Sequence, residues 1–97
     1  MHEQLSRTVV VRGRAGLHAR PADLFVKLAN RYQAQVEIQK GHERVDGKSI
    51  LNLLTLAAEK GCPLIILATG PDAADALQAL VELFESNFGE PEAEPLP

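Results

Sequence analysis

The segment Gly16–Ala22, Gly-Leu-His-Ala-Arg-Pro-Ala, places an imidazole, a guanidinium and a proline in order at the start of an expected helix. Pro21 suits a first helical turn, because the N–H that proline lacks would have no intrahelical partner there. The apolar residues that follow recur at the spacing of one helical face: Ala22, Phe25, Leu28 and Ala29. We therefore expect His18 at or just outside the helix N-terminus, where unpaired N–H groups and the peptide dipoles favour an anion.

His18 and Arg20 together suit phosphoryl transfer through a phosphohistidine. A neutral imidazole nitrogen attacks phosphorus without a general base, and positioning and charge stabilisation supply most of the catalysis in such transfers. An isolated loop histidine is most often an ordinary surface or capping residue, but the neighbouring Gly16, Arg20 and Pro21 favour the chemical interpretation. Arg20 taken alone reads as a solvated arginine. At a helix N-terminus, which disfavours cations, it indicates an anionic partner such as a phosphate.

Ser49 precedes a second apolar helix, expected over residues 50–59, and serine is a preferred helix N-cap. A regulatory phosphate on Ser49 is a further hypothesis, since its charge would lie at the positive end of the helix dipole. In the stretch 50–58 only Asn52 and Thr55 are polar, so the apolar arc is about twice the ~100° that a surface helix needs. Either another element covers the excess or it forms an exposed docking patch. We favour docking, because the chain has no element to spare.

The composition is that of one small acidic domain. The chain has 97 residues, 45% of them hydrophobic, and a formal net charge of −3, which disfavours a nucleic-acid-binding protein. No apolar run approaches the ~20 residues that span a bilayer, and residues 1–4 lack the features of a signal peptide, so we expect a cytoplasmic protein. Cys62 has no cysteine partner, and His2 and His42 lack neighbours at metal-ligand spacing, so we expect neither a metal site nor a cofactor. The chain also lacks a recognisable acid–base pair, which argues against an enzyme acting on a small molecule.

Four strands and three helices must position these residues. The hydrophobic patterns predict strands over residues 5–12, 34–39, 43–46 and 64–69, and helices over 21–31, 50–59 and 73–88. The order βαββαβα in so short a chain predicts an α+β fold, with an antiparallel sheet and the helices collected on one face. We divide the chain into a domain of residues 1–89 and an acidic, proline-rich tail of residues 90–97, which is expected to stay unpacked.

The segments Gly16–Ala22 and Gly47-Lys48-Ser49-Ile50-Leu51 resemble the HPr family, the histidine-containing phosphocarrier proteins of the bacterial phosphoenolpyruvate-dependent phosphotransferase system. The likeness covers about residues 5–89, and the His-Ala-Arg-Pro motif at this position is highly specific. The resemblance implies an open-faced β-sandwich, with a four-stranded antiparallel sheet in the order 1-4-2-3 and three helices on one side.

The resemblance also implies roles for particular residues. His18 would take a phosphoryl group from enzyme I and pass it to sugar-specific enzyme IIA components, while Arg20 would stabilise the phosphate. Ser49 matches the serine that HPr kinase/phosphorylase modifies in some lineages. The apolar docking patch of the family matches Ile50, Leu51 and Leu54, to which we add Leu17. On this interpretation the chain is a monomeric phosphocarrier and not an enzyme, with no cofactor and no metal.

Two alternatives stay open. The segment 83–90 looks more like the nitrogen-related branch of the family, whose relay regulates rather than imports, whereas Gly47–Ile50 looks more like the branch with the regulatory serine. The chain could also be a regulatory binding module, in which a phosphate on Ser49 switches the affinity of the apolar patch for a regulator.

Overall fold

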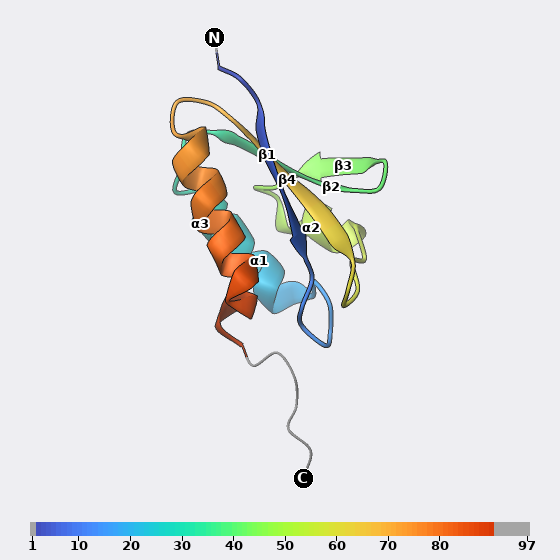
Figure 1. The fold of residues 1–97 in the computed structure, drawn as a ribbon. Helices are drawn as coiled ribbons and strands as arrows, with labels where there is room; N and C mark the ends of the chain where they lie inside the picture. The colour runs from blue at the N-terminus through green and yellow to red at the C-terminus, as the bar shows by residue number, and fades with distance from the viewer. Residues whose placement is uncertain (1, 91–97) are drawn as a thin grey trace.

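The computed structural model describes residues 2–90, and their element order is the predicted one (Figure 1). The strands are β1 (Leu5–Val10), β2 (Gln35–Lys40), β3 (Glu43–Asp46) and β4 (Pro63–Thr69). The helices are α1 (Ala19–Ala29), α2 (Ile50–Thr55) and α3 (Ala73–Glu85), followed by the 3₁₀ turn η1 (Asn87–Gly89). The predicted tail lies outside the described residues except for Glu90.

The four strands form one antiparallel sheet in the order β1-β4-β2-β3. The helices cover one face of the sheet and the other face is open (Figure 1), which confirms the predicted α+β sandwich. β4 is an interior strand, because it pairs with β1 on one side and with β2 on the other. This position explains its almost unbroken apolar sequence.

The core fills the space between the sheet and the helices. Alternate residues of the strands point into it, as in β2, where Val36 and Ile38 are fully buried. Three aromatic rings pack together where the C-terminal end of α3 meets α1. The ring of Phe84 packs edge-on against Phe25, with centroids 6.0 Å apart, and against Phe88, with centroids 4.8 Å apart. These contacts hold the C-terminal end of α3 against α1.

Asp72, at the start of α3, fixes the connection between α1 and β2. Its carboxylate accepts hydrogen bonds from the N–H groups of Gln33 (2.9 Å) and Ala34 (2.8 Å). The Gln33 bond is the largest cause that holds the pKa of Asp72 below its ordinary value of 3.8. The Ala34 bond and the charge of Lys48 act in the same direction, while partial burial of the carboxyl acts against them.

Two helix boundaries near the predicted site differ from the prediction. α1 begins at Ala19 rather than at Pro21, so the proline is the third residue of the helix, still within the first turn. α2 ends at Thr55 rather than at residue 59. Ala57 adopts a left-handed backbone conformation, with φ of 49°, which a continuing helix does not allow. The turn lets Leu56 and Ala58 both enter the core, although residues two positions apart lie on nearly opposite sides of a helix.

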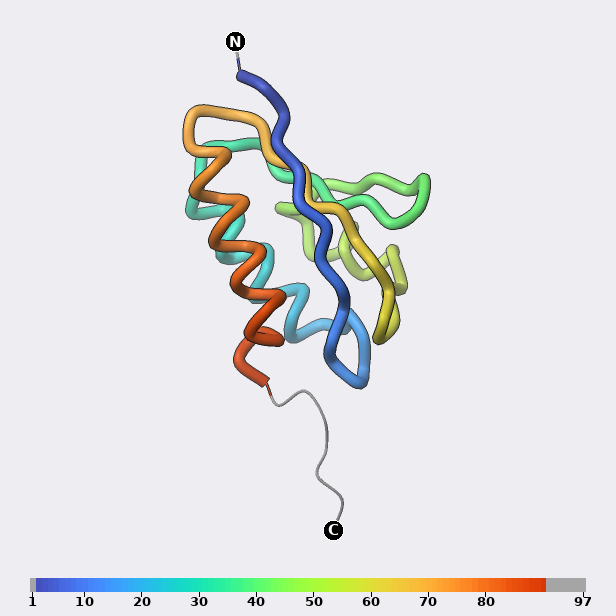
Figure 2. The backbone as a smooth tube through the Cα atoms, in the orientation of Figure 1, coloured from blue at the N-terminus to red at the C-terminus, as the bar shows by residue number. Residues whose placement is uncertain are grey.

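The third helix also ends earlier than predicted, at Glu85 rather than at residue 88. Asn87 and Phe88 adopt left-handed backbone conformations, with φ of 53° and 56°. This reversal turns the Phe88 side chain back onto Phe84 and buries it. As a result, the end of the described chain lies beside the turn that joins β1 to α1 (Figure 2), where Arg12 Nη1 donates a hydrogen bond to the Glu85 carbonyl at 2.7 Å.

Candidate functional site

His18 is the N-cap residue of α1, at the position that the sequence predicts. Its backbone is extended, and its carbonyl accepts the first intrahelical hydrogen bond, from the Ala22 N–H at 3.1 Å. Within residues 2–90 the His18 side chain makes no capping hydrogen bond, and the residue is exposed. The imidazole is therefore accessible to a partner, at the positive end of the helix dipole.

The backbone before His18 is held by the segment that follows α2. The Leu17 N–H donates to the Ala58 carbonyl at 2.8 Å, and the Gly16 N–H donates to Gly13 at 3.0 Å. Gly16 has a φ of +73°, and a Cβ on it would lie only 2.4 Å from the Ala58 carbonyl oxygen. Glycine is required here for both reasons, since it alone tolerates this conformation and this close approach. The contact with Ala58 thus fixes the position of the backbone that leads into His18.

Arg20 has an anionic partner, but that partner is a carboxylate of the same chain. Its Nε lies 3.3 Å from Oε2 of Glu90. The Arg20 side chain is 61% exposed and the Glu90 side chain 30%. The expectation that an arginine at this helix N-terminus needs an anion is therefore met in the structure without a phosphate.

Glu90 and Ala58 are the two residues of this site that the sequence analysis missed. Glu90 is the first residue of the predicted tail, yet its N–H donates to the Asn87 carbonyl at 2.9 Å and its side chain pairs with Arg20. No local signal identifies either residue, since both contacts join segments that are far apart in the sequence.

Ser49 caps α2, as its residue type predicts. Its Oγ accepts hydrogen bonds from the backbone N–H of Asn52 at 3.3 Å and from Asn52 Nδ2 at 2.9 Å. This cap satisfies one of the backbone N–H groups that the first turn of the helix leaves unpaired. At the other end, Lys40 Nζ donates to the Leu56 carbonyl at 2.8 Å and neutralises the negative end of the dipole.

The apolar residues of α2 divide into a buried set and an exposed set. Leu51 is 72% exposed and Leu54 37%, while Ile50 is half-buried beside them. These three residues form the surface that we call the α2 patch. The exposed part of the apolar arc is narrower than predicted, because the Leu56 side chain is buried in the core. Leu17 also departs from the expectation of a docking residue: its side chain is only 5% exposed and belongs to the core.

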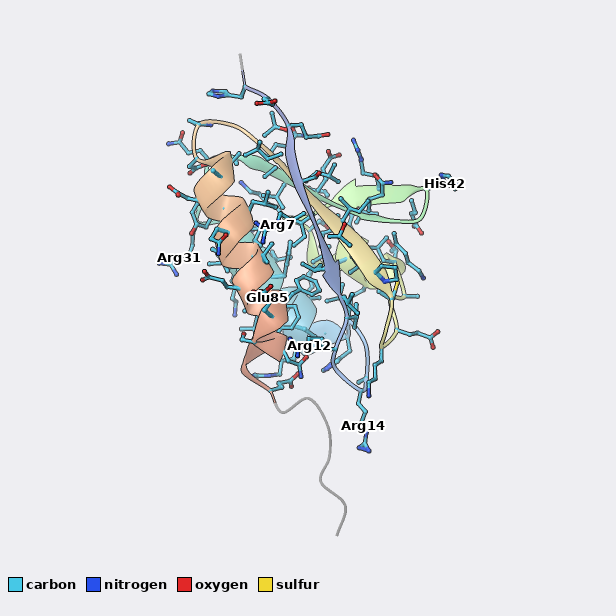
Figure 3. All side chains as sticks on the ribbon, in the orientation of Figure 1. Arg7, Arg12, Arg14, Arg31, His42 and Glu85 are labelled. Atoms are coloured by element: carbon cyan, nitrogen blue, oxygen red, sulfur yellow. The ribbon has the colours of Figure 1, made fainter. Side chains whose placement is uncertain are left out.

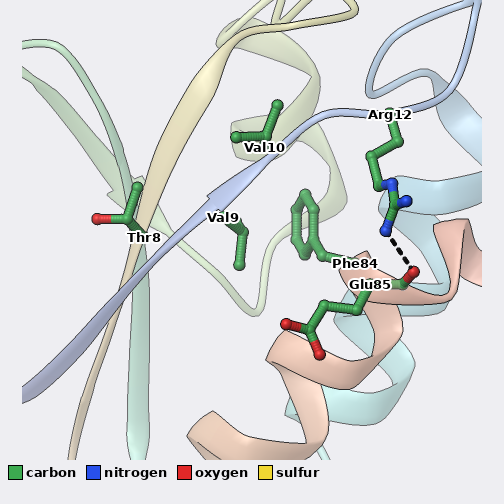
Figure 4. Close-up of a pocket in the computed structure, with 6 residues that line it drawn as sticks. All are labelled: Thr8, Val9, Val10, Arg12, Phe84 and Glu85. Carbon is green, nitrogen blue, oxygen red and sulfur yellow. Dashed lines mark hydrogen bonds between the residues drawn. The ribbon is translucent and has the colours of Figure 1, made fainter.

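Both positive and negative side chains lie around the site, among them Arg20 and its partner Glu90. Arg12 and Arg14 lie on the turn that joins β1 to α1, whereas His42 lies at the tip of the β2–β3 hairpin on the far side of the sheet (Figure 3). An open pocket of about 350 Å³ lies between β1 and α3, lined by Val10, Phe84 and Arg12 among others, and His18 is not part of it (Figure 4). A residue that hands a group to a partner protein needs an accessible surface rather than a pocket.

Two further structural findings concern the classes of protein considered from the sequence. Among residues 2–90 there is no group of three or more histidine, cysteine or acidic side chains placed to hold a metal ion. In the same part of the chain, no helix has the length and apolar character needed to cross a membrane.

Comparison with known proteins identifies relatives along nearly the whole domain. A family profile described as the PTS HPr component phosphorylation site matches residues 5–86. The phosphocarrier protein HPr of Neisseria meningitidis is 38% identical over 88 residues, which are 91% of this chain and 99% of that protein. The HPr of Pseudomonas aeruginosa is 44% identical over 85 residues, covering 87% and 94% of the two chains.

Solved structures agree with the sequence comparison. A crystal structure of HPr-C-His from Thermoanaerobacter tengcongensis superimposes with a TM-score of 0.87 at 38% identity, covering 90% of this chain and 98% of that one. The profile match spans both the His18 turn and the α2 patch, and the relatives are similar in length to the domain. On this basis the chain belongs to the HPr family of phosphocarrier proteins.

Proposed function

We propose that His18 carries a phosphoryl group from phosphorylated enzyme I to enzyme IIA components of the phosphotransferase system, in the cytoplasm. The observation that carries the proposal is the placement of His18. Its imidazole is exposed at the N-terminus of α1, is not used to cap that helix, and is followed two residues later by an arginine. An accessible nucleophile at the positive end of a helix dipole is what a carrier must present to a donor and then to an acceptor.

The transfer needs few groups from the protein. The lone pair of a neutral His18 ring nitrogen attacks phosphorus, the bond between phosphorus and the donor breaks, and its electron pair leaves with the donor. No proton has to move in this step. The chain contributes the position of the ring and compensation of the phosphoryl charge by Arg20 and the N-terminus of α1. The reverse arrangement, with an acceptor as nucleophile, releases the group.

Labelling with phosphoenolpyruvate and enzyme I tests the proposal. We expect an acid-labile, base-stable phosphoprotein, and we expect His18→Ala to abolish the label. His42→Ala is a matched control, since it removes an exposed histidine at the far hairpin and should leave the label intact. Undiminished labelling of His18→Ala, or no labelling of the wild type, would refute the assignment.

The α2 patch is our candidate for the surface that binds enzyme I and the acceptor. Leu51 and Leu54 are large apolar side chains exposed on a single short helix. Burial of such side chains is a common source of binding energy in protein interfaces. The acceptor decides whether the carrier serves sugar uptake or the nitrogen-related branch. Transfer rates to purified enzyme IIA proteins of each kind would distinguish the two branches.

A regulatory role of Ser49 is the second candidate function, and its position favours it. Ser49 caps the helix that carries Leu51 and Leu54, so a phosphate there would add charge directly beside the α2 patch. HPr kinase/phosphorylase would be the modifying partner. Affinity of a regulator for the two forms tests the idea: equal affinity with and without phosphate on Ser49 would refute the switch.

A further inference from the structure

We propose that Lys40 is a positioning residue for the turn that presents His18. Its ammonium group binds the backbone at the end of α2, and the Ala58 carbonyl in the same stretch of backbone binds the residue before His18. This role, which rests on the proposed function, makes the rate of transfer depend on a residue in a strand that contributes nothing else to the site.

Lys40 lies on the side of β2 that the helices cover. Side chains alternate along a strand, and the two preceding residues of the same parity, Val36 and Ile38, are fully buried. Lys40 is half-buried, so its charged end needs hydrogen-bond acceptors. Its Nζ donates to the Leu56 carbonyl at 2.8 Å and to the Ala57 carbonyl at 3.4 Å. The lysine thus joins the end of β2 to the end of α2.

The end of α2 has no cation of its own. The last carbonyl groups of a helix lack intrahelical partners, and α2 has no basic residue in its last turn. The backbone also reverses here, since Ala57 has φ of 49°, a conformation that residues other than glycine rarely adopt. Lys40 donates to the carbonyl before this reversal and to the carbonyl of the reversed residue itself. Its ammonium therefore stabilises the reversal directly.

The backbone that follows the reversal holds both ends of the turn between β1 and α1 (Figure 2). At one end, the Val11 N–H donates to the Cys62 carbonyl at 3.0 Å, and the Gly61 N–H donates to the Val11 carbonyl at 2.8 Å. At the other end, the Leu17 N–H donates to the Ala58 carbonyl at 2.8 Å. The position of the turn therefore depends on the position of the α2–β4 connection.

Loss of the ammonium should displace the Ala58 carbonyl. The reversal at Ala57 loses two hydrogen bonds, and Ala58 is the next residue, so any movement of the reversal weakens the bond from the Leu17 N–H. The α2 patch precedes the reversal in the chain. The loss should therefore affect the orientation of His18, and with it the chemical step, more than the binding of a partner.

Steady-state phosphorylation by enzyme I, with this protein as the varied substrate, tests the inference. Lys40→Met should lower kcat about three- to tenfold and leave KM unchanged. Lys40→Arg keeps a cation that can donate to the same carbonyls and should recover most of the rate. Arg44→Met is the matched control. Arg44 pairs with Gln39 in the sheet register, which places it on the open face of the same hairpin, so its loss should leave kcat unchanged.

Hydrogen exchange of the Leu17 amide, followed by NMR, separates positioning from a general loss of stability. This amide should exchange about tenfold faster in Lys40→Met and at the wild-type rate in Arg44→Met. Lys40→Gln replaces Lys40→Met if the latter does not fold, with the same results expected.

Three results would overturn the inference and leave the carrier function intact. They are an unchanged kcat in a folded Lys40→Met or Lys40→Gln protein, a lower kcat with wild-type exchange of the Leu17 amide, and an equal fall of kcat in Lys40→Arg and Lys40→Met. Absence of phosphorylation in the wild type would overturn the proposed function itself.

Discussion

Replacement of Gly16 by alanine tests how the turn before His18 is positioned. The substitution introduces a Cβ 2.4 Å from the Ala58 carbonyl oxygen, on a residue with φ of +73°. The obstructing atom belongs to the backbone, so it cannot move aside as a flexible side chain would. The carbonyl must shift by roughly 1 Å to restore an ordinary contact. Such a shift breaks the hydrogen bond that the Leu17 N–H donates to it at 2.8 Å.

Gly41→Ala provides the matched control. Gly41 also has positive φ, at +58°, but a Cβ there would meet no atom of the described residues within 4 Å. Both substitutions therefore share the conformational cost, about 1–2 kcal/mol, and the gain from a stiffer unfolded chain. Only Gly16→Ala loses the Leu17 hydrogen bond and leaves its N–H in a poorly solvated place, which costs about 1–3 kcal/mol more.

Urea unfolding of the two variants measures this difference directly. We expect Gly16→Ala to be less stable than Gly41→Ala by about 1–3 kcal/mol, and to be phosphorylated on His18 more slowly, because the turn that presents the imidazole has moved. Gly41→Ala should be phosphorylated at the wild-type rate. Equal stabilities of the two variants would show that the contact with Ala58 does not constrain the turn.

The remaining predictions address the elements around the site. Ser49→Ala should lower the free energy of unfolding by about 1 kcal/mol in urea titrations, because Asn52 loses its acceptor. Leu51→Ser should change stability by no more than about 0.5 kcal/mol, since the side chain is exposed, yet weaken binding to enzyme I in calorimetry; Leu53→Ala, in the core, should cost about 2–5 kcal/mol. Asp72→Asn should reduce stability at neutral pH. Because the folded-state pKa of Asp72 is lowered, its contribution is present above the ordinary value of 3.8 and is lost as the pH falls through the folded-state pKa, so unfolding curves of the two proteins should converge in acid.

The sequence predicted the number, type and order of the elements, and it placed His18 at a helix N-terminus. These features depend on residues that are near one another in the chain: the proline in the first turn of α1, the alternation in β2, and serine as the cap of α2. The helix ends were harder to predict. α2 stops at Thr55, and the turn that follows it buries both Leu56 and Ala58 in the core. The apolar spacing in the sequence does not show which of these residues the core buries.

The proposed chemistry of the site follows from the sequence alone, since a histidine, an arginine and a proline at this spacing bring the candidate nucleophile and its candidate counter-charge to one helix end wherever that helix lies. The partners of these residues were decided only by the tertiary structure. Ala58 holds the turn before His18, and Glu90 occupies Arg20, through contacts between segments distant in the chain. Such contacts form because packing of α3 against α1 and of the α2–β4 connection against the turn brings the atoms together. No local pattern of residue types predicts these contacts.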